Sequence, residues 1–272
     1  MDRSPTVARP APDGEAGQGA VVLEAEGLTF AYGRNAVLRG VTLRVAPSEF
    51  VALVGPNGSG KSTLLRLLLG LTKPQTGQVR LFGQPPDRLT ERWRVGYVPQ
   101  RPVLAGSLPA TVEEVVASGR LARRGWQRRL RPSDWAEVEH AIASVGLEGM
   151  RRRRLTELSV GQQQRAYIAK AFAGRPELLV LDEPVAGVDT DSQARFRDSL
   201  VHLIAEHGAG VLLVSHELSA VADDLDRVVV LRNGTVSFDG AAAELTATGV
   251  SLGVHRQDLP VWLEGPDIRD AS

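Results

Sequence analysis

The feature that most constrains the fold is a glycine-rich loop between an apolar run and a helical pattern. Residues 55–62 read GPNGSGKS, which has the form GxxxxGK followed by Ser or Thr. They follow FVALV at 50–54, an apolar run typical of a strand buried in a parallel sheet. The next segment, LLRLLLGL at 64–71, predicts a helix with Arg66 on its more solvated side. Strand, loop and helix in this order predict a phosphate-binding loop within an α/β fold.

The residue types in this loop suit a nucleoside triphosphate. Glycines let the backbone curl so that several N–H groups point inward at phosphate oxygens, and the helix that follows adds unpaired N–H groups. Lys61 is predicted to reach the β- and γ-phosphates, and the Ser62 hydroxyl to ligate Mg²⁺. The full candidate set is Gly55, Pro56, Asn57, Gly58, Ser59, Gly60, Lys61, Ser62 and Thr63.

A second apolar run, LLVLDEP, ends in the two acids Asp182 and Glu183. Ligands of open α/β sheets bind at the carboxyl ends of the strands, so both acids are placed for chemistry. Asp182 suits Mg²⁺, a hard cation that prefers oxygen ligands, and Glu183 suits orienting and deprotonating an attacking water. Alone, the pair reads equally well as two solvated acids at a strand end; the upstream phosphate loop favours the functional interpretation.

The remaining patterns organise the chain around this core. Apolar and polar residues alternate, as in half-buried antiparallel strands, in VVLEAEGLTFAY and AVLRGVTLRV. Helical periodicity is found in TVEEVVASG and SDWAEVEHAIASVG. Strands then resume with LLVLDEP, VLLVSH and VVVLRNG, with a helix near 190–207, which indicates an α/β class. The expected parts are a disordered tail (1–20), one domain (21–240) with its core at 21–100 and 176–240 and a helical subdomain at about 101–175, and a C-terminal helix and tail (241–272).

Composition removes several function classes. Lysines and arginines number 32 and acids also 32, so the net charge of zero argues against nucleic-acid binding through bulk charge. There is no cysteine, which excludes disulfides, cysteine zinc sites and thiol chemistry. No apolar run approaches the ~20 residues that span a bilayer, and the first segment lacks the apolar middle of a secretory signal. We therefore expect any membrane role to come through a partner chain.

Three further segments give the sequence its family resemblance. LSVGQQQR at 158–165 resembles the LSGGQ signature of the ABC ATPases. Gln100, in VGYVPQ, stands where that family has its Q-loop glutamine, and His216, in LLVSHE, where it has its switch histidine. The resemblance covers about 21–240 and implies a P-loop (RecA-like) core with an N-terminal antiparallel β subdomain and an inserted helical subdomain.

The resemblance also implies how the nucleotide is held. Tyr32 matches the aromatic residue that stacks on adenine, and Asp189 lies in the D-loop. ATP and Mg²⁺ are the implied ligands, with Gln100 beside Ser62 and Asp182 at the metal. His216 would hold the γ-phosphate and the attacking water.

In the family, two subunits pack head to tail, and each nucleotide lies between one phosphate loop and the other chain's signature. Ser159 is a good helix N-cap residue, and N–H groups of the first helical turn can face a γ-phosphate. Ser159, Gly161 and Gln162 are therefore the expected signature contacts. The signature departs from the pattern at Val160, whose branched side chain adds bulk; we hypothesise that closure of the pair is tolerated but strained or slowed.

The resulting prediction is an ATP-hydrolysing subunit of an ABC membrane transporter. Two segments resemble ATPase subunits of manganese, zinc and iron importers: TVEEVVASGRLARRGWQRRLRPSDW and the GQQQR of the signature. Subunits that import iron chelates share part of this pattern. The expected partners are a permease, a second copy of the chain and, indirectly, a substrate-binding protein, at the cytoplasmic face of the membrane and without nucleic acid. The alternatives are a soluble ABC ATPase of translation or DNA repair and a P-loop kinase, although a kinase leaves the signature and Glu183 unexplained.

Overall fold

The structure is a computed structural model of the chain. It describes residues 21–100, 109–124, 129–184, 190–215, 218, 221–241 and 244. The expected tails, 1–20 and almost all of 241–272, lie outside the described residues. Within the described ranges, no helix combines the length and the apolar character needed to cross a membrane.

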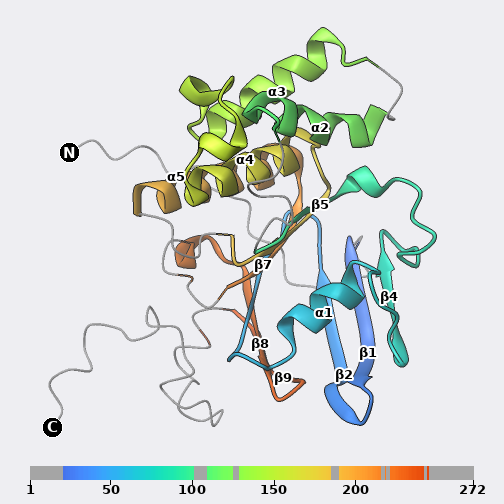
Figure 1. Cartoon of the computed structure of the whole chain (residues 1–272). Helices are drawn as coiled ribbons and strands as arrows, with labels where there is room; N and C mark the ends of the chain where they lie inside the picture. The colour runs from blue at the N-terminus through green and yellow to red at the C-terminus, as the bar shows by residue number, and fades with distance from the viewer. Residues whose placement is uncertain are drawn as a thin grey trace, which may run out of the picture.

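A six-stranded sheet forms the centre of the fold (Figure 1). Its order is β5 (Val95–Val98), β6 (Leu178–Asp182), β7 (Gly210–Val214), β3 (Phe50–Val54), β8 (Arg227–Arg232) and β9 (Thr235–Gly240). The first five strands run parallel and β9 pairs antiparallel with β8. Every residue of β3 and β7 is buried, as continuous apolar strands covered on both faces must be.

A second, three-stranded antiparallel sheet confirms the predicted N-terminal β unit. Its order is β2 (Asn35–Val45), β1 (Leu23–Tyr32), β4 (Thr76–Leu81). Exposed and buried residues alternate along β2 from Gly40 to Val45, so one face lies on the core. That core is shared with helix α1 (Lys61–Leu68) and one face of the large sheet. The leucines of α1 are buried and Arg66 is exposed, as the sequence pattern predicts.

The opposite face of the large sheet is covered by helices. Three of them, α2 (Val112–Arg124), α3 (Pro132–Ser144) and α4 (Val160–Ala173), pack on one another and are called the helical unit below. Figure 1 shows this unit as one layer above the strands, with α5 (Thr190–His207) alongside. Four short 3-10 turns complete the described elements, at Arg92–Arg94, Glu148–Met150, Leu155–Glu157 and Ala222–Asp224.

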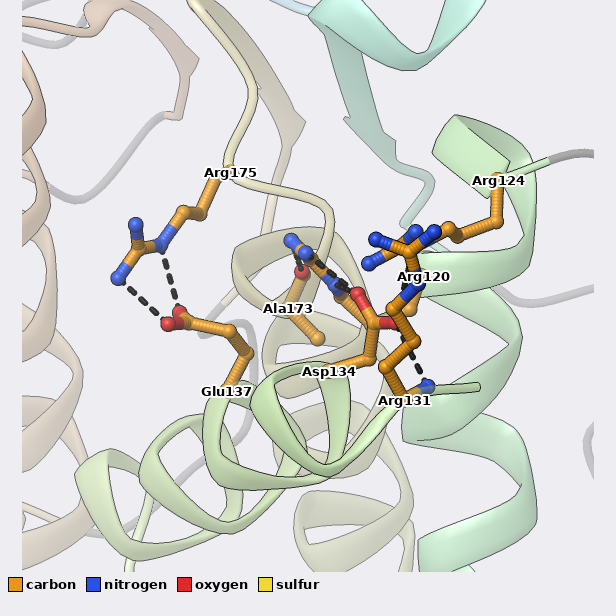
Figure 2. Close-up of polar contacts among 7 residues, drawn as sticks. All are labelled: Arg120, Arg124, Arg131, Asp134, Glu137, Ala173 and Arg175. Carbon is orange, nitrogen blue, oxygen red and sulfur yellow. Dashed lines mark hydrogen bonds and ion pairs between the residues drawn. The ribbon is translucent and has the colours of Figure 1, made fainter. Parts of the chain in front are cut away.

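A buried carboxylate lies at the centre of the helical unit (Figure 2). Asp134 is fully buried, and its Oδ1 accepts from Arg120 Nη2 at 2.8 Å while its Oδ2 pairs with Arg124 Nε at 2.9 Å. The Arg131 backbone N–H donates to Oδ2 at 2.9 Å, and Arg120 also donates to the Ala173 carbonyl at 3.1 Å. Burial alone would raise the pKa of Asp134, but these hydrogen bonds and guanidinium charges lower it to about 2. The carboxylate thus joins α2, α3 and the end of α4.

Three strands and one turn are additional to the sequence prediction. β4, β5 and β9 were not predicted, and β8 and β9 are joined by a tight turn at Asn233 and Gly234. Both turn residues have positive φ, 50° and 79°, the geometry that makes Asn-Gly the preferred two-residue hairpin turn.

Candidate nucleotide-binding site

The phosphate loop fits against neighbouring backbone so closely that two of its positions require glycine. A Cβ built on Gly55 would lie 2.1 Å from the Leu231 carbonyl oxygen, which no side chain can tolerate. Gly60 has φ +108° and its Cβ would lie 2.8 Å from a methyl of Leu38. The loop is therefore held in one shape by β8 on one side and β2 on the other, and Gly60 caps the start of α1.

Lys61 is buried and directed back over the loop. Its Nζ donates to the Gly55 carbonyl at 2.6 Å and to the Pro56 carbonyl at 3.1 Å. Burial lowers the pKa of Lys61, whereas the charges of Glu183 and Asp182 oppose that shift. The ammonium is consequently fixed at the mouth of the loop, near both strand-end acids.

The loop also buries a hydroxyl. Ser59 is buried, with only 3% of its surface exposed, and its Oγ has no hydrogen-bond partner among the described residues. A buried hydroxyl costs free energy unless it is paired, so this atom suits an anionic oxygen within the loop. The residues present therefore fit a bound phosphate chain: a fixed ammonium, an orphan hydroxyl and the first turn of α1. Of the other loop residues, Asn57, Gly58 and Ser62 are exposed, and Thr63 is half-buried in α1.

The turn between β8 and β9 is hydrogen-bonded to the phosphate loop, a contact that was not predicted from the sequence. Gly234 N–H donates to the Ser59 carbonyl at 3.1 Å, and the Gly234 carbonyl accepts from Arg39 N–H at 2.8 Å. Gly234 is required here because a Cβ would lie 2.1 Å from the Val37 carbonyl oxygen. The Asn-Gly pair was a readable signal for this hairpin.

The two strand-end acids lie beside Lys61 at the carboxyl end of β6. Burial raises the pKa of Asp182, as does the Glu183 charge, while Lys61 lowers it. Glu183 has φ +46°, an unusual value for a residue with a side chain, and its N–H donates to the Val214 carbonyl at 2.8 Å. Gln100 Nε2 donates to Glu183 Oε2 at 2.7 Å. The structure thus brings the predicted glutamine and glutamate into direct contact.

Tyr32 stands at the end of β1 with half of its surface exposed. Its ring meets Phe30 edge to face, with centroids 5.0 Å apart, and Arg66 Nη1 donates to its hydroxyl at 3.3 Å. The ring is held from two sides and still presents an open surface, as base stacking requires. The hydrogen bond from Arg66 to Tyr32 was not predicted, because the helical periodicity indicates only that Arg66 lies on the solvent side of its helix.

The signature lies in the helical unit, at the start of α4. Ser159 caps the helix by accepting from Gln162 N–H at 3.3 Å, and Gln162 Oε1 accepts from Ser159 N–H at 3.0 Å. This reciprocal capping box leaves Val160 82% exposed, with Gly161 following it in the first turn. Figure 1 shows α4 and α1 in different layers of the molecule. Asp189 and His216 lie outside the described residues.

A phosphate loop on a parallel sheet, acids at a neighbouring strand end and a helical insertion define a P-loop nucleotide-binding protein. The ABC transporter family profile matches residues 38–186, and the chain belongs to this ABC transporter family of ATP-binding subunits. It accordingly binds and hydrolyses ATP, as subunits of this kind do.

Relatives and solved structures agree with this assignment. The chain is 38% identical over 224 residues to the zinc uptake system ATP-binding protein ZurA of Listeria monocytogenes, covering 82% of this chain and 87% of that protein. It is 39% identical to the high-affinity zinc uptake protein ZnuC of Bacillus subtilis over 76% of this chain and 89% of ZnuC. A structure of cbiO1 from Clostridium perfringens, part of an ABC transporter complex, superposes with TM-score 0.73 at 28% identity, covering 85% of this chain and 92% of cbiO1.

Proposed function

We propose that this chain is the ATP-hydrolysing subunit of a transporter that takes up a divalent metal ion, zinc or manganese. The observation that carries the proposal is the 38% identity to a zinc-uptake subunit across 82% of this chain. A manganese transport subunit, MntB of Bacillus subtilis, is 34% identical over 79% of the chain. The relatives do not favour a soluble ABC ATPase of translation or DNA repair.

The described residues support specific roles at the nucleotide. Lys61 binds the β- and γ-phosphates, and the Ser59 hydroxyl and the first-turn N–H groups of α1 bind phosphate oxygens. Ser62, Asp182 and Gln100 are the candidate ligands of Mg²⁺, which neutralises phosphate charge when bound.

Glu183 is the proposed general base. Its hydrogen bond from Gln100 fixes the carboxylate orientation at a strand end whose backbone bends sharply. Glu183 Oε2 accepts from Gln100 at 2.7 Å, and the carboxylate so oriented is the group proposed to accept a proton from water. His216 is proposed to hold the γ-phosphate and that water, and Tyr32 to stack on adenine.

A second copy of the chain is proposed to complete the site. The signature helix α4 lies in a different layer from α1 (Figure 1). Val160, in the first turn of α4, is 82% exposed. Head-to-tail pairing would bring Ser159, Gly161 and Gln162 of one chain, and Asp189 of its D-loop, to the nucleotide of the other. Loss of the γ-phosphate removes charge that both chains bind, so hydrolysis would loosen the pair.

The permease is proposed to dock on a groove between β5 and the helical unit. This groove has a volume of about 380 Å³ and is lined by Trp93, Tyr97, Pro99 and Tyr167 among others. Pro99 precedes Gln100, so a partner seated there would sense the site through one peptide unit. The chain would then be peripheral at the cytoplasmic membrane face, and a substrate-binding protein would deliver the metal to the permease.

The test is metal uptake by a strain that lacks the chromosomal copy. Restoring the wild-type chain should restore uptake of zinc or manganese, and Lys61→Ala should fail because the phosphates lose their fixed charge. Arg80→Ala, an exposed substitution on β4, is the matched control and should transport normally. Normal uptake of both metals without the chain would refute the proposed function.

A further inference from the structure

Two histidines meet where the helical unit contacts the core. His140 on α3 and His202 on α5 place their Nε2 atoms 3.2 Å apart, with ring planes tilted by 41°. Beside them lies a cavity of about 20 Å³, lined also by Ser144, Phe172 and His207. Three of the five histidines of the chain therefore gather at one small space between two elements distant in sequence.

The distance between the Nε2 atoms of His140 and His202 matches that between two imidazole ligands of one metal ion. Zinc binds imidazole nitrogen at about 2.0–2.1 Å with tetrahedral angles, which sets two such nitrogens roughly 3.3–3.4 Å apart. The 3.2 Å separation of His140 and His202 lies within a few tenths of an ångström of that value. A cavity of 20 Å³ exceeds the ~10–15 Å³ that one water needs, and His140 is exposed, so an ion can enter from solvent.

We infer that His140 and His202 form a surface site for a divalent ion that prefers imidazole nitrogen, with Zn²⁺ as the principal candidate. No group of three or more metal-ligating side chains is found in the described part of the chain, so water completes the coordination. Glu137 also lines the cavity, but both of its oxygens pair with Arg175 at 2.6 Å (Figure 2). The ligand set is therefore nitrogen, which disfavours Mg²⁺ and Mn²⁺, ions that prefer oxygen.

This site is separate from the nucleotide chemistry and independent of the proposed transport function. An ion held by both rings would link α3, which packs on the signature helix α4, to α5. The competing interpretation is a plain hydrogen bond, in which one neutral imidazole donates to the other. The two interpretations differ in whether Zn²⁺ affinity depends on both rings.

The experiment is calorimetric titration of the full-length chain with ZnCl₂ in excess Mg²⁺, which occupies oxygen sites. Wild type should bind one more Zn²⁺ per chain than His140→Asn or His202→Asn, or bind it at least about tenfold more tightly. The double variant should lose no more than either single variant, because both rings hold the same ion. Glu148→Gln, an exposed carboxylate outside the cavity, is the control and should bind like wild type.

Unfolding temperatures without zinc check that the variants fold, and added Zn²⁺ should raise the unfolding temperature of wild type and Glu148→Gln but not of the histidine variants. Unchanged Zn²⁺ binding in both single variants would overturn the inference in favour of the hydrogen bond. Additive losses in the double variant would overturn it by showing that the two rings do not hold one ion. Manganese displacing zinc at equal concentration would overturn the nitrogen-ligand assignment.

Discussion

The core and the helical unit surround their carboxylates in opposite ways: Asp134 is fully buried among cations, and Asp182 is half-buried beside another acid. Asp134 in the helical unit accepts from two guanidiniums and a backbone N–H, and its pKa falls to about 2. Asp182 at the end of β6 sits among apolar strands beside another acid, and burial raises its pKa. The surroundings of Asp134 stabilise its anion, whereas burial and the Glu183 charge disfavour the anion of Asp182. The groups that face a carboxylate thus decide whether the fold favours its charged or its neutral form.

The largest expected effect is at the chemical site. Glu183→Gln should lower ATP turnover by about 10²–10⁴-fold, because an amide cannot accept the proton of the attacking water. ATP binding should persist and the paired state should accumulate, which light scattering with ATP would detect. Glu157→Gln, a change at an exposed carboxylate near the signature, is the control. A monomer with normal turnover would remove Glu183 from the mechanism.

A stability comparison between the two acids sharpens the contrast. Asp134→Asn should lower the free energy of unfolding by about 3 kcal/mol, since it leaves two guanidiniums facing a neutral amide. Asp182→Asn should leave stability unchanged or slightly higher while reducing turnover, because it removes a half-buried charge that lies beside a second acid. Chemical denaturation measures both, and equal destabilisation by the two variants would contradict the distinction.

The two acids also predict opposite pH dependences. The folded pKa of Asp134, about 2, lies below its ordinary value of 3.8, so its stabilisation is present above pH 4 and is lost as pH falls toward 2. The folded pKa of Asp182 is raised, so its relative stabilisation is present below pH 4 and is lost as pH rises through the folded value. In denaturation from pH 6 to 3, Asp134→Asn should flatten the acid decline relative to wild type, and Asp182→Asn should not.

A smaller effect is expected at the edge of the helical unit. Arg151 donates to both oxygens of Glu113, at 2.6 and 2.8 Å, and to Glu139 at 2.8 Å. These groups are partly exposed, so Arg151→Ala should cost about 1 kcal/mol. Arg152→Ala, its exposed neighbour, should cost little, and the difference should shrink at high salt in thermal unfolding.

The smallest expected effect is at the signature. Val160 is exposed at the first turn of α4, and Val160→Gly should raise ATP turnover of the assembled transporter by less than about threefold, because bulk facing the second copy is removed. Gly161 stays in place as the family pattern requires. Steady-state phosphate release measures the change, and no change or a decrease would count against the strain hypothesis.

The sequence predicted those parts of the fold that local pattern encodes. β3, the loop and α1 were readable because a fully apolar strand, glycines and helical periodicity follow one another within 50–68. β4 and β9 were missed because their burial is weak and irregular, and β5 because it spans four residues. Such strands are defined by their partners, which single-sequence patterns do not show.

The sequence predicted which residues line the candidate site better than it predicted the contacts that hold the surrounding structure together. The Gln100–Glu183 contact joins residues 83 positions apart, and adjacency of β5 and β6 produces it. The carboxyl ends of parallel strands meet at one edge, so the contact follows once the strand order is known. Asp134 gave no sequence signal, because the guanidiniums of Arg120 and Arg124 reach it from another helix.

The peptide units on either side of Gly234 connect two parts of the molecule that the chain visits far apart. One bonds the phosphate loop through Ser59, and the other bonds the small sheet through Arg39. Any displacement of the loop is therefore shared with the small sheet, which carries Tyr32, the residue proposed to stack on adenine. The hairpin couples the phosphate loop to the small sheet, so under the proposed binding mode the phosphate end and the base end of a nucleotide would contact parts that move together.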